Sequence, residues 1–243
     1  AAIALGEDTA SSESAGDAAR SRVIQRLARI YGCDVDAVSL HPSGMTALHR
    51  ALQLVSALRP SRPVLQIGFP YVDVLKLPQV VFSGAELLLD DSEAEVSAAL
   101  ERLQPSAVVV ELPSNPLLRC VDLPTVARLA HQQGIPVIAD DTIGSGININ
   151  ALPHSDLVFS SLTKSFAGRG DVLAGSLVLS HHSRWREQLA ASAKALQPLA
   201  QLAGNDAIAL DQGSEDVGER VHRLNANTLF LAERLRHHPA VAN

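Results

Sequence analysis

The sequence predicts an α/β fold of three layers, with a mainly parallel central sheet covered by helices on both faces. Short apolar runs alternate with amphipathic stretches along most of the 243 residues. The apolar runs are rich in valine, isoleucine and leucine and have no polar face, which is typical of parallel strands buried on both sides. Ligands in such sheets bind beyond the carboxyl ends of the strands, so polar residues that follow these runs are the first candidates for a site.

The N-terminal part divides into a polar segment and a helix. Residues 1–16 are small and polar, and we expect them to form a flexible arm because they offer little to pack against a core. From residue 17 on, Val23, Leu27 and Ile30 recur at helical spacing, and Gly32 predicts the end of that helix. A short strand is expected between this helix and Ser43.

The remaining elements follow in alternation. Helices are predicted over residues 45–58, 92–103 and 123–133, and Pro60 ends the first of them. Strands are predicted over residues 64–67, 86–89, 107–112, 136–139, 157–160 and 175–179. The pattern therefore predicts a large domain over residues 17–213.

The C-terminal segment 214–243 is predicted to be mainly one long helix. Val217, Val221, Leu224 and Leu231 recur with polar residues between them, which is the pattern of an amphipathic helix. We expect its apolar stripe to pack on the core or on a partner subunit.

Composition narrows the class of protein. A net charge of −6 and the absence of a basic run interleaved with aromatics argue against nucleic-acid binding. No apolar run approaches the roughly 20 residues that span a bilayer, so we expect no membrane-spanning segment. We expect the protein to be cytoplasmic. The two cysteines, Cys33 and Cys120, fit neither a disulfide framework nor a metal pattern, and no metal site is predicted.

Lys164 is the first candidate for chemistry. It ends the hydroxyl-rich run SSLTK at 160–164, directly after a predicted strand. A pyridoxal phosphate (PLP) enzyme needs a lysine that binds the cofactor's aldehyde, with hydroxyls beside it to hold the phosphate. Asp140 follows another strand, 24 residues before Lys164 (164 minus 140), and a carboxylate there could keep the pyridine nitrogen protonated. A surface lysine and a strand-end aspartate that caps a turn are the alternatives.

Several motifs occur in an order that resembles a known family. They are SGMT at 43–46, FPY at 69–71, ELPSNP at 111–116, ADDT at 139–142 and SSLTK at 160–164. Together they resemble the Cys/Met-metabolism family of fold-type-I PLP enzymes, the cystathionine γ-synthase and γ-lyase group. The resemblance runs from about Arg20 to the last residue and implies the large domain of a fold-type-I PLP transferase.

The resemblance implies roles around the phosphate and the ring nitrogen. Lys164 matches the cofactor lysine and Asp140 the pyridine-binding aspartate. Backbone N–H groups of Gly44 and Met45 would bind the phosphate at a helix start, where the positive end of the helix dipole favours an anion. Ser161 and Thr163 would complete that cup. From local sequence alone, Ser43 is better explained as a plain helix N-cap.

Three further residues are implied by the same resemblance. Tyr71 matches the tyrosine that stacks on the pyridine ring, and Asn115 the asparagine that binds the ring hydroxyl. Thr142 belongs to the aspartate motif and is expected at the cofactor site. Loop packing for Tyr71 and an Asn-Pro turn for Asn115 are the alternatives.

The sequence also departs from the family pattern. Asp141 stands where the family has asparagine, and Arg169-Gly170-Asp171 replaces the usual His-Ser-Asp. No Tyr-x-Arg motif precedes Ser43, although the family uses one to grip the phosphate from a neighbouring subunit. We expect the smaller C-terminal domain, which supplies the arginine for the substrate carboxylate, to be absent from these residues.

The resemblance implies a PLP-dependent enzyme that acts on small-molecule amino-acid substrates. The expected reaction is γ-replacement on an O-acyl or O-phospho homoserine with cysteine, which gives cystathionine. A cystathionine γ-lyase, an acylhomoserine sulfhydrylase and a non-catalytic PLP-fold module are the alternatives. A homodimer or homotetramer is expected, because the family's sites lie between subunits.

Overall fold

The computed structural model describes residues 2–196 and 200–241, with side chains described from residue 13 on, and its centre is a seven-stranded sheet. The strand order is β1-β7-β6-β5-β4-β2-β3. The strands are β1 (Val38–His41), β2 (Val64–Ile67), β3 (Ala85–Leu88), β4 (Ala107–Glu111), β5 (Val137–Asp140), β6 (Leu157–Ser161) and β7 (Gly175–Leu179). Strands β2 to β6 are parallel, and β7 is antiparallel to both β1 and β6. The predicted mainly parallel sheet is confirmed.

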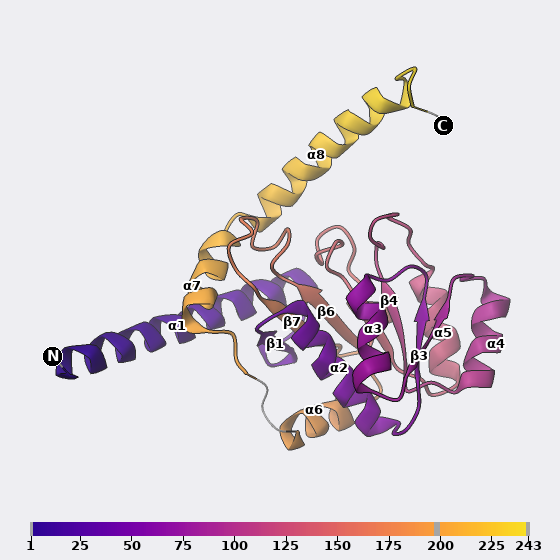
Figure 1. Ribbon diagram of the computed structural model, residues 1–243, viewed down its shortest axis with the longest axis horizontal. Helices are drawn as coiled ribbons and strands as arrows, with labels where there is room; N and C mark the ends of the chain where they lie inside the picture. The colour runs from indigo at the N-terminus through magenta and orange to yellow at the C-terminus, as the bar shows by residue number, and fades with distance from the viewer. Residues whose placement is uncertain (1, 197–199, 242–243) are drawn as a thin grey trace.

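Helices cover both faces of this sheet (Figure 1). One layer contains α1 (Ala2–Tyr31), α4 (Glu93–Leu103), α5 (Leu123–Gln132) and α7 (Gly204–Gly213). The other contains α2 (Gly44–Leu58), α3 (Val72–Val81) and α6 (Arg186–Ala195). Side chains alternate between the two layers as the pleat requires: Val108 and Val110 of β4 join the first core and Val109 the second. Both faces are thus apolar, and the strands lack a polar side.

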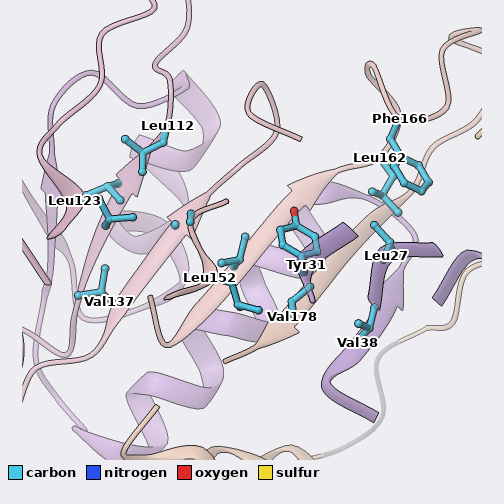
Figure 2. Close-up of a cluster of buried hydrophobic side chains, with 14 of the residues drawn as sticks. Leu27, Tyr31, Val38, Leu112, Leu123, Val137, Leu152, Leu162, Phe166 and Val178 are labelled. Atoms are coloured by element: carbon cyan, nitrogen blue, oxygen red, sulfur yellow. The ribbon is translucent and has the colours of Figure 1, made fainter. Parts of the chain in front are cut away.

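Helix α1 packs deep into the first core. Leu27 and Tyr31 lie in one apolar cluster with Val178 and Leu162, as Figure 2 shows. The predicted boundaries agree closely with the structure: the six predicted strands and three inner helices match within one residue at each end. Helices α3, α6 and α7 were not predicted, and α3 contains Pro78, a residue that is unusual inside a helix.

One prediction about the chain ends differs from the structure, and another stays open. Residues 2–16, expected as a flexible arm, are helical and continuous with the amphipathic helix that follows. Alanine and glutamate in this segment favour helix, and the polar pattern that predicted an arm does not exclude it. The C-terminal helix is α8 (Val217–Arg236), of which Val217 and Val221 are buried. Beyond residue 221 its apolar stripe is exposed in this single chain, and Figure 1 shows α8 leading away from the sheet. The expected packing of that stripe on a partner subunit therefore stays a prediction.

Candidate active site

A cavity of about 620 Å³ lies where the carboxyl ends of β4, β5 and β6 meet. This volume is in the range of small-molecule sites, roughly 300–1,000 Å³. All nine residues predicted for the site line it: Gly44, Met45, Tyr71, Asn115, Asp140, Thr142, Ser161, Thr163 and Lys164. The fold therefore brings together the residues that the motifs singled out, although their binding roles stay predictions.

Lys164 lies in the turn directly after β6, with its side chain exposed at the cavity. Its carbonyl accepts a hydrogen bond from Gly168 N at 3.0 Å. The Thr163 hydroxyl accepts from Ala174 N at 3.1 Å and lies 3.4 Å from Ala174 O. Thr163 therefore ties the lysine turn to the start of β7, besides facing the cavity in which it is predicted to bind phosphate.

Asp140 ends β5 and is 4% exposed. Its Oδ1 accepts hydrogen bonds from Thr142 N at 3.0 Å and Thr142 Oγ1 at 2.6 Å. Burial raises the pKa of Asp140 to about 6, against the lowering effect of these two bonds. The Thr142 hydroxyl in turn accepts from Ser161 N at 2.9 Å, so Thr142 links the aspartate to the end of β6.

Glu111 is a site residue to which the sequence analysis gave no role. It ends β4, is 5% exposed and lines the cavity. Its Oε2 accepts a hydrogen bond from Tyr71 N at 2.5 Å, so Glu111 holds the turn that bears Tyr71. Burial, and then the nearby charge of Asp140, raise the pKa of Glu111 to about 7. The signal was available, since Glu111 is a carboxylate at the end of a buried strand, as Asp140 is.

The N-terminus of α2 forms another side of the cavity. Ser43 is its N-cap, as the simpler interpretation predicted, and Ser43 Oγ accepts from Thr46 N at 3.1 Å. The first N–H groups of a helix have no partner within it, so those of Gly44 and Met45 can bind an anion. A Cβ on Gly44 would lie 2.8 Å from Ser161 Cβ, so only glycine lets the helix start approach the end of β6 so closely.

Tyr71 and Asn115 lie on loops at the mouth of the cavity. Tyr71 is 43% exposed, which leaves its ring free to contact a ligand in the cavity. The backbone N–H of Asn115 also bonds to Glu111 and opposes the rise in its pKa. One buried carboxyl group therefore holds both loops.

Asp141, at the family's asparagine position, is fully buried. Its Oδ2 accepts from Tyr31 OH at 3.1 Å and from Gly146 N at 2.7 Å, while Oδ1 has no hydrogen-bond partner among the described residues. Burial raises the pKa of Asp141 to about 8. The side chain bonds to Tyr31 of α1 and does not line the cavity, and its raised pKa favours the neutral form of the carboxyl group at neutral pH.

Helix α8 contributes a wall that the motifs did not predict. Val221, Leu224 and Asn225 line the cavity. Asn225 Nδ2 donates to Asn148 Oδ1 at 2.7 Å, and Asn148 Nδ2 donates back at 3.2 Å. The apolar stripe of α8 was visible in the sequence, but the contact of this helix with Asn148 depends on tertiary structure.

The residues present fit pyridoxal phosphate. A helix N-terminus suits the phosphate, a buried carboxyl group suits a protonated ring nitrogen, and an accessible lysine suits the aldehyde. Gly44 provides the cradle that a Cβ would fill. In the described part of the chain, no group of three or more His, Cys, Asp or Glu side chains could hold a metal ion. No described helix is long and apolar enough to cross a membrane.

Comparison with known proteins gives the family. The model for the Cys/Met metabolism PLP-dependent enzymes matches residues 14–243. The cystathionine γ-synthase of Neurospora crassa is 34% identical, over 84% of this chain and 34% of its own length. The L-2-amino-4-chloropent-4-enoate dechlorinase/desaturase of Streptantibioticus cattleyicolor is also 34% identical, over 96% of this chain and 47% of its own.

A solved structure supports the fold. That of CalE6, a methionine γ-lyase from Micromonospora echinospora, superposes with a TM-score of 0.71 at 29% identity, over 85% of this chain and 55% of its own. The chain thus spans about a third to a half of the length of the curated relatives named above.

Proposed function

Because the chain belongs to the family of Cys/Met metabolism PLP-dependent enzymes, we propose that it catalyses γ-replacement on an activated homoserine, with cysteine as the incoming nucleophile. The product would be cystathionine. The observation that carries the proposal is that Lys164, Asp140 and the N-terminus of α2 face one cavity. Similarity to a protein named cystathionine γ-synthase supports this choice of reaction.

Each residue would have a distinct task. When bound, pyridoxal phosphate supplies an electron sink for the carbanion formed on the substrate. Lys164 Nζ would hold the cofactor and then move protons to and from the substrate carbons. Asp140 would stay ionised against the ring nitrogen, since a cation beside it favours the carboxylate form. Gly44 and Met45 N–H groups would bind the phosphate.

Product analysis tests the reaction. The purified protein with PLP is incubated with O-acylhomoserine or O-phosphohomoserine and with cysteine, sulfide or no thiol. Cystathionine formed only with cysteine supports the proposal. Homocysteine from sulfide would indicate a sulfhydrylase, and a 2-oxo acid with ammonia would indicate a lyase.

The relatives make these alternatives concrete, because one of them is named for dechlorination and desaturation rather than for γ-replacement. If no substrate is turned over and no PLP is bound, the non-catalytic PLP-fold module becomes the better interpretation. A cytoplasmic homodimer or homotetramer is also part of the proposal, and light scattering of the purified protein measures the oligomer.

A further inference from the structure

The side chain of Arg220, near the start of α8, lies between that helix and the loop that follows Lys164. Its Nε donates to Ser165 O at 3.2 Å, and its Nη2 donates to Phe166 O at 2.7 Å. Nη2 also donates to Gly213 O at 2.8 Å, at the end of α7, and Nη1 donates to Asp216 Oδ1. One guanidinium therefore joins the lysine loop, α7 and α8.

The loop held by Arg220 is short and directly continuous with Lys164. Phe166 is buried in the core that contains Val217 and Val221 of α8. Ala167 N donates to Leu162 O at 2.9 Å, and Gly168 N donates to Lys164 O at 3.0 Å. These two hydrogen bonds hold the backbone of residues 162 and 164, and they form only when residues 165–168 are in place.

Gly168 makes room for the guanidinium. A Cβ at this position would lie 2.5 Å from Arg220 Cζ. Gly170, two residues later, has nearly the same φ, +72° against +77°, but a Cβ there would meet no atom within 4 Å. The two glycines share the strain that a side chain would cause at positive φ and differ in the contact with Arg220.

We propose that Arg220 is a positioning residue that fixes the loop bearing Lys164 to helix α8, so that the placement of α8 sets the placement of the lysine. The same helix lines the cavity through Val221 and Leu224, so it contacts both the lysine loop and the cavity. A lysine at position 220 could keep the charge but not the fork of donors that reaches several carbonyls at once. The effect on cofactor binding by Lys164 rests on the proposed function. The attachment of the lysine loop to α8 by Arg220 does not.

Hydrogen exchange of the cofactor-free protein tests the attachment of the lysine loop to α8, and it needs neither cofactor binding nor enzyme activity. In Arg220→Lys, the amides of Ala167 and Gly168 should exchange at least about tenfold faster, as expected for the loss of charge-assisted bonds. The matched control is Arg223→Lys, an exposed arginine of the same helix, which should leave these amides unchanged. Unchanged exchange in Arg220→Lys would overturn the proposal.

The glycine pair tests it independently. Gly168→Ala should speed exchange of the same amides and reduce the fraction of PLP trapped on Lys164 by borohydride, whereas Gly170→Ala should do neither. Equal effects of the two variants would show that backbone strain alone is responsible, against the proposal. If exchange changes as expected but even the wild type traps no PLP, the proposed function fails and the role of Arg220 in holding the loop stands.

Discussion

Glu111 and Asp140 are registered partners at the carboxyl ends of β4 and β5, and both carboxyl groups are buried. Their pKa values are raised to about 7 and about 6. Burial is the main cause for both, and the charge of Asp140 adds to the rise at Glu111. Near neutral pH, therefore, Asp140 is the more readily ionised of the two, as its proposed partnership with a ring nitrogen requires.

Glu111→Gln should flatten the pH dependence of stability. Since the folded-state pKa of Glu111 lies above its ordinary value of 4.5, the folded protein binds this proton more tightly. The free energy of unfolding should therefore fall as the pH rises from about 5 to about 8. Urea denaturation of the cofactor-free protein measures this, with the exposed Glu101→Gln as control. An equal slope in wild type and Glu111→Gln would contradict the assignment.

Asp141→Asn should stabilise the protein at high pH. The buried carboxyl group has its pKa raised to about 8, so its ionised form is costly in the folded state. Asparagine can still accept from Tyr31 OH and Gly146 N through its carbonyl oxygen. We expect a gain on the order of 2 kcal/mol at about pH 8, and a smaller one at about pH 5. A gain of the same size at both pH values would argue against the titration of Asp141.

Thr142→Val should weaken the site through Asp140. The variant removes the hydroxyl that donates to Asp140 Oδ1 and accepts from Ser161 N. Because that bond lowers the Asp140 pKa, its loss should raise it further. PLP should then bind about tenfold more weakly, and the free energy of unfolding should fall by about 1–3 kcal/mol. Fluorescence titration measures the affinity for PLP, and denaturation measures the free energy of unfolding. Thr142→Ser, which keeps the hydroxyl, should restore both quantities.

Much of the fold could be predicted because the strands are short, apolar and clearly bounded. The site residues were predictable where they follow a strand or belong to a motif, as Asp140 and Lys164 do. The contacts of Arg220 and the Asn148–Asn225 pair could not be predicted, since they join segments 55 and 77 residues apart that only tertiary folding brings together. Where the apolar stripe of α8 packs could not be predicted, because an amphipathic pattern indicates an apolar face without saying which surface covers it.

The hydroxyls of Thr142 and Thr163 illustrate another limit. Their motifs indicated the cofactor site, and both residues do line the cavity. Their hydrogen bonds, however, go to Asp140, Ser161 and Ala174, so each holds a neighbouring part of the site. Residue spacing predicts proximity to a ligand but not which neighbour a hydroxyl will bind.

The central claim, that Lys164 binds the cofactor, is tested most directly by borohydride trapping. The protein is incubated with PLP, reduced, digested and analysed by mass spectrometry, with Lys164→Ala as the variant and Lys194→Ala as the control. We predict a cofactor adduct on the peptide that contains Lys164 in the wild type and in Lys194→Ala, and its loss in Lys164→Ala. Adducts spread equally over the lysines, or no adduct in the wild type, would contradict the account.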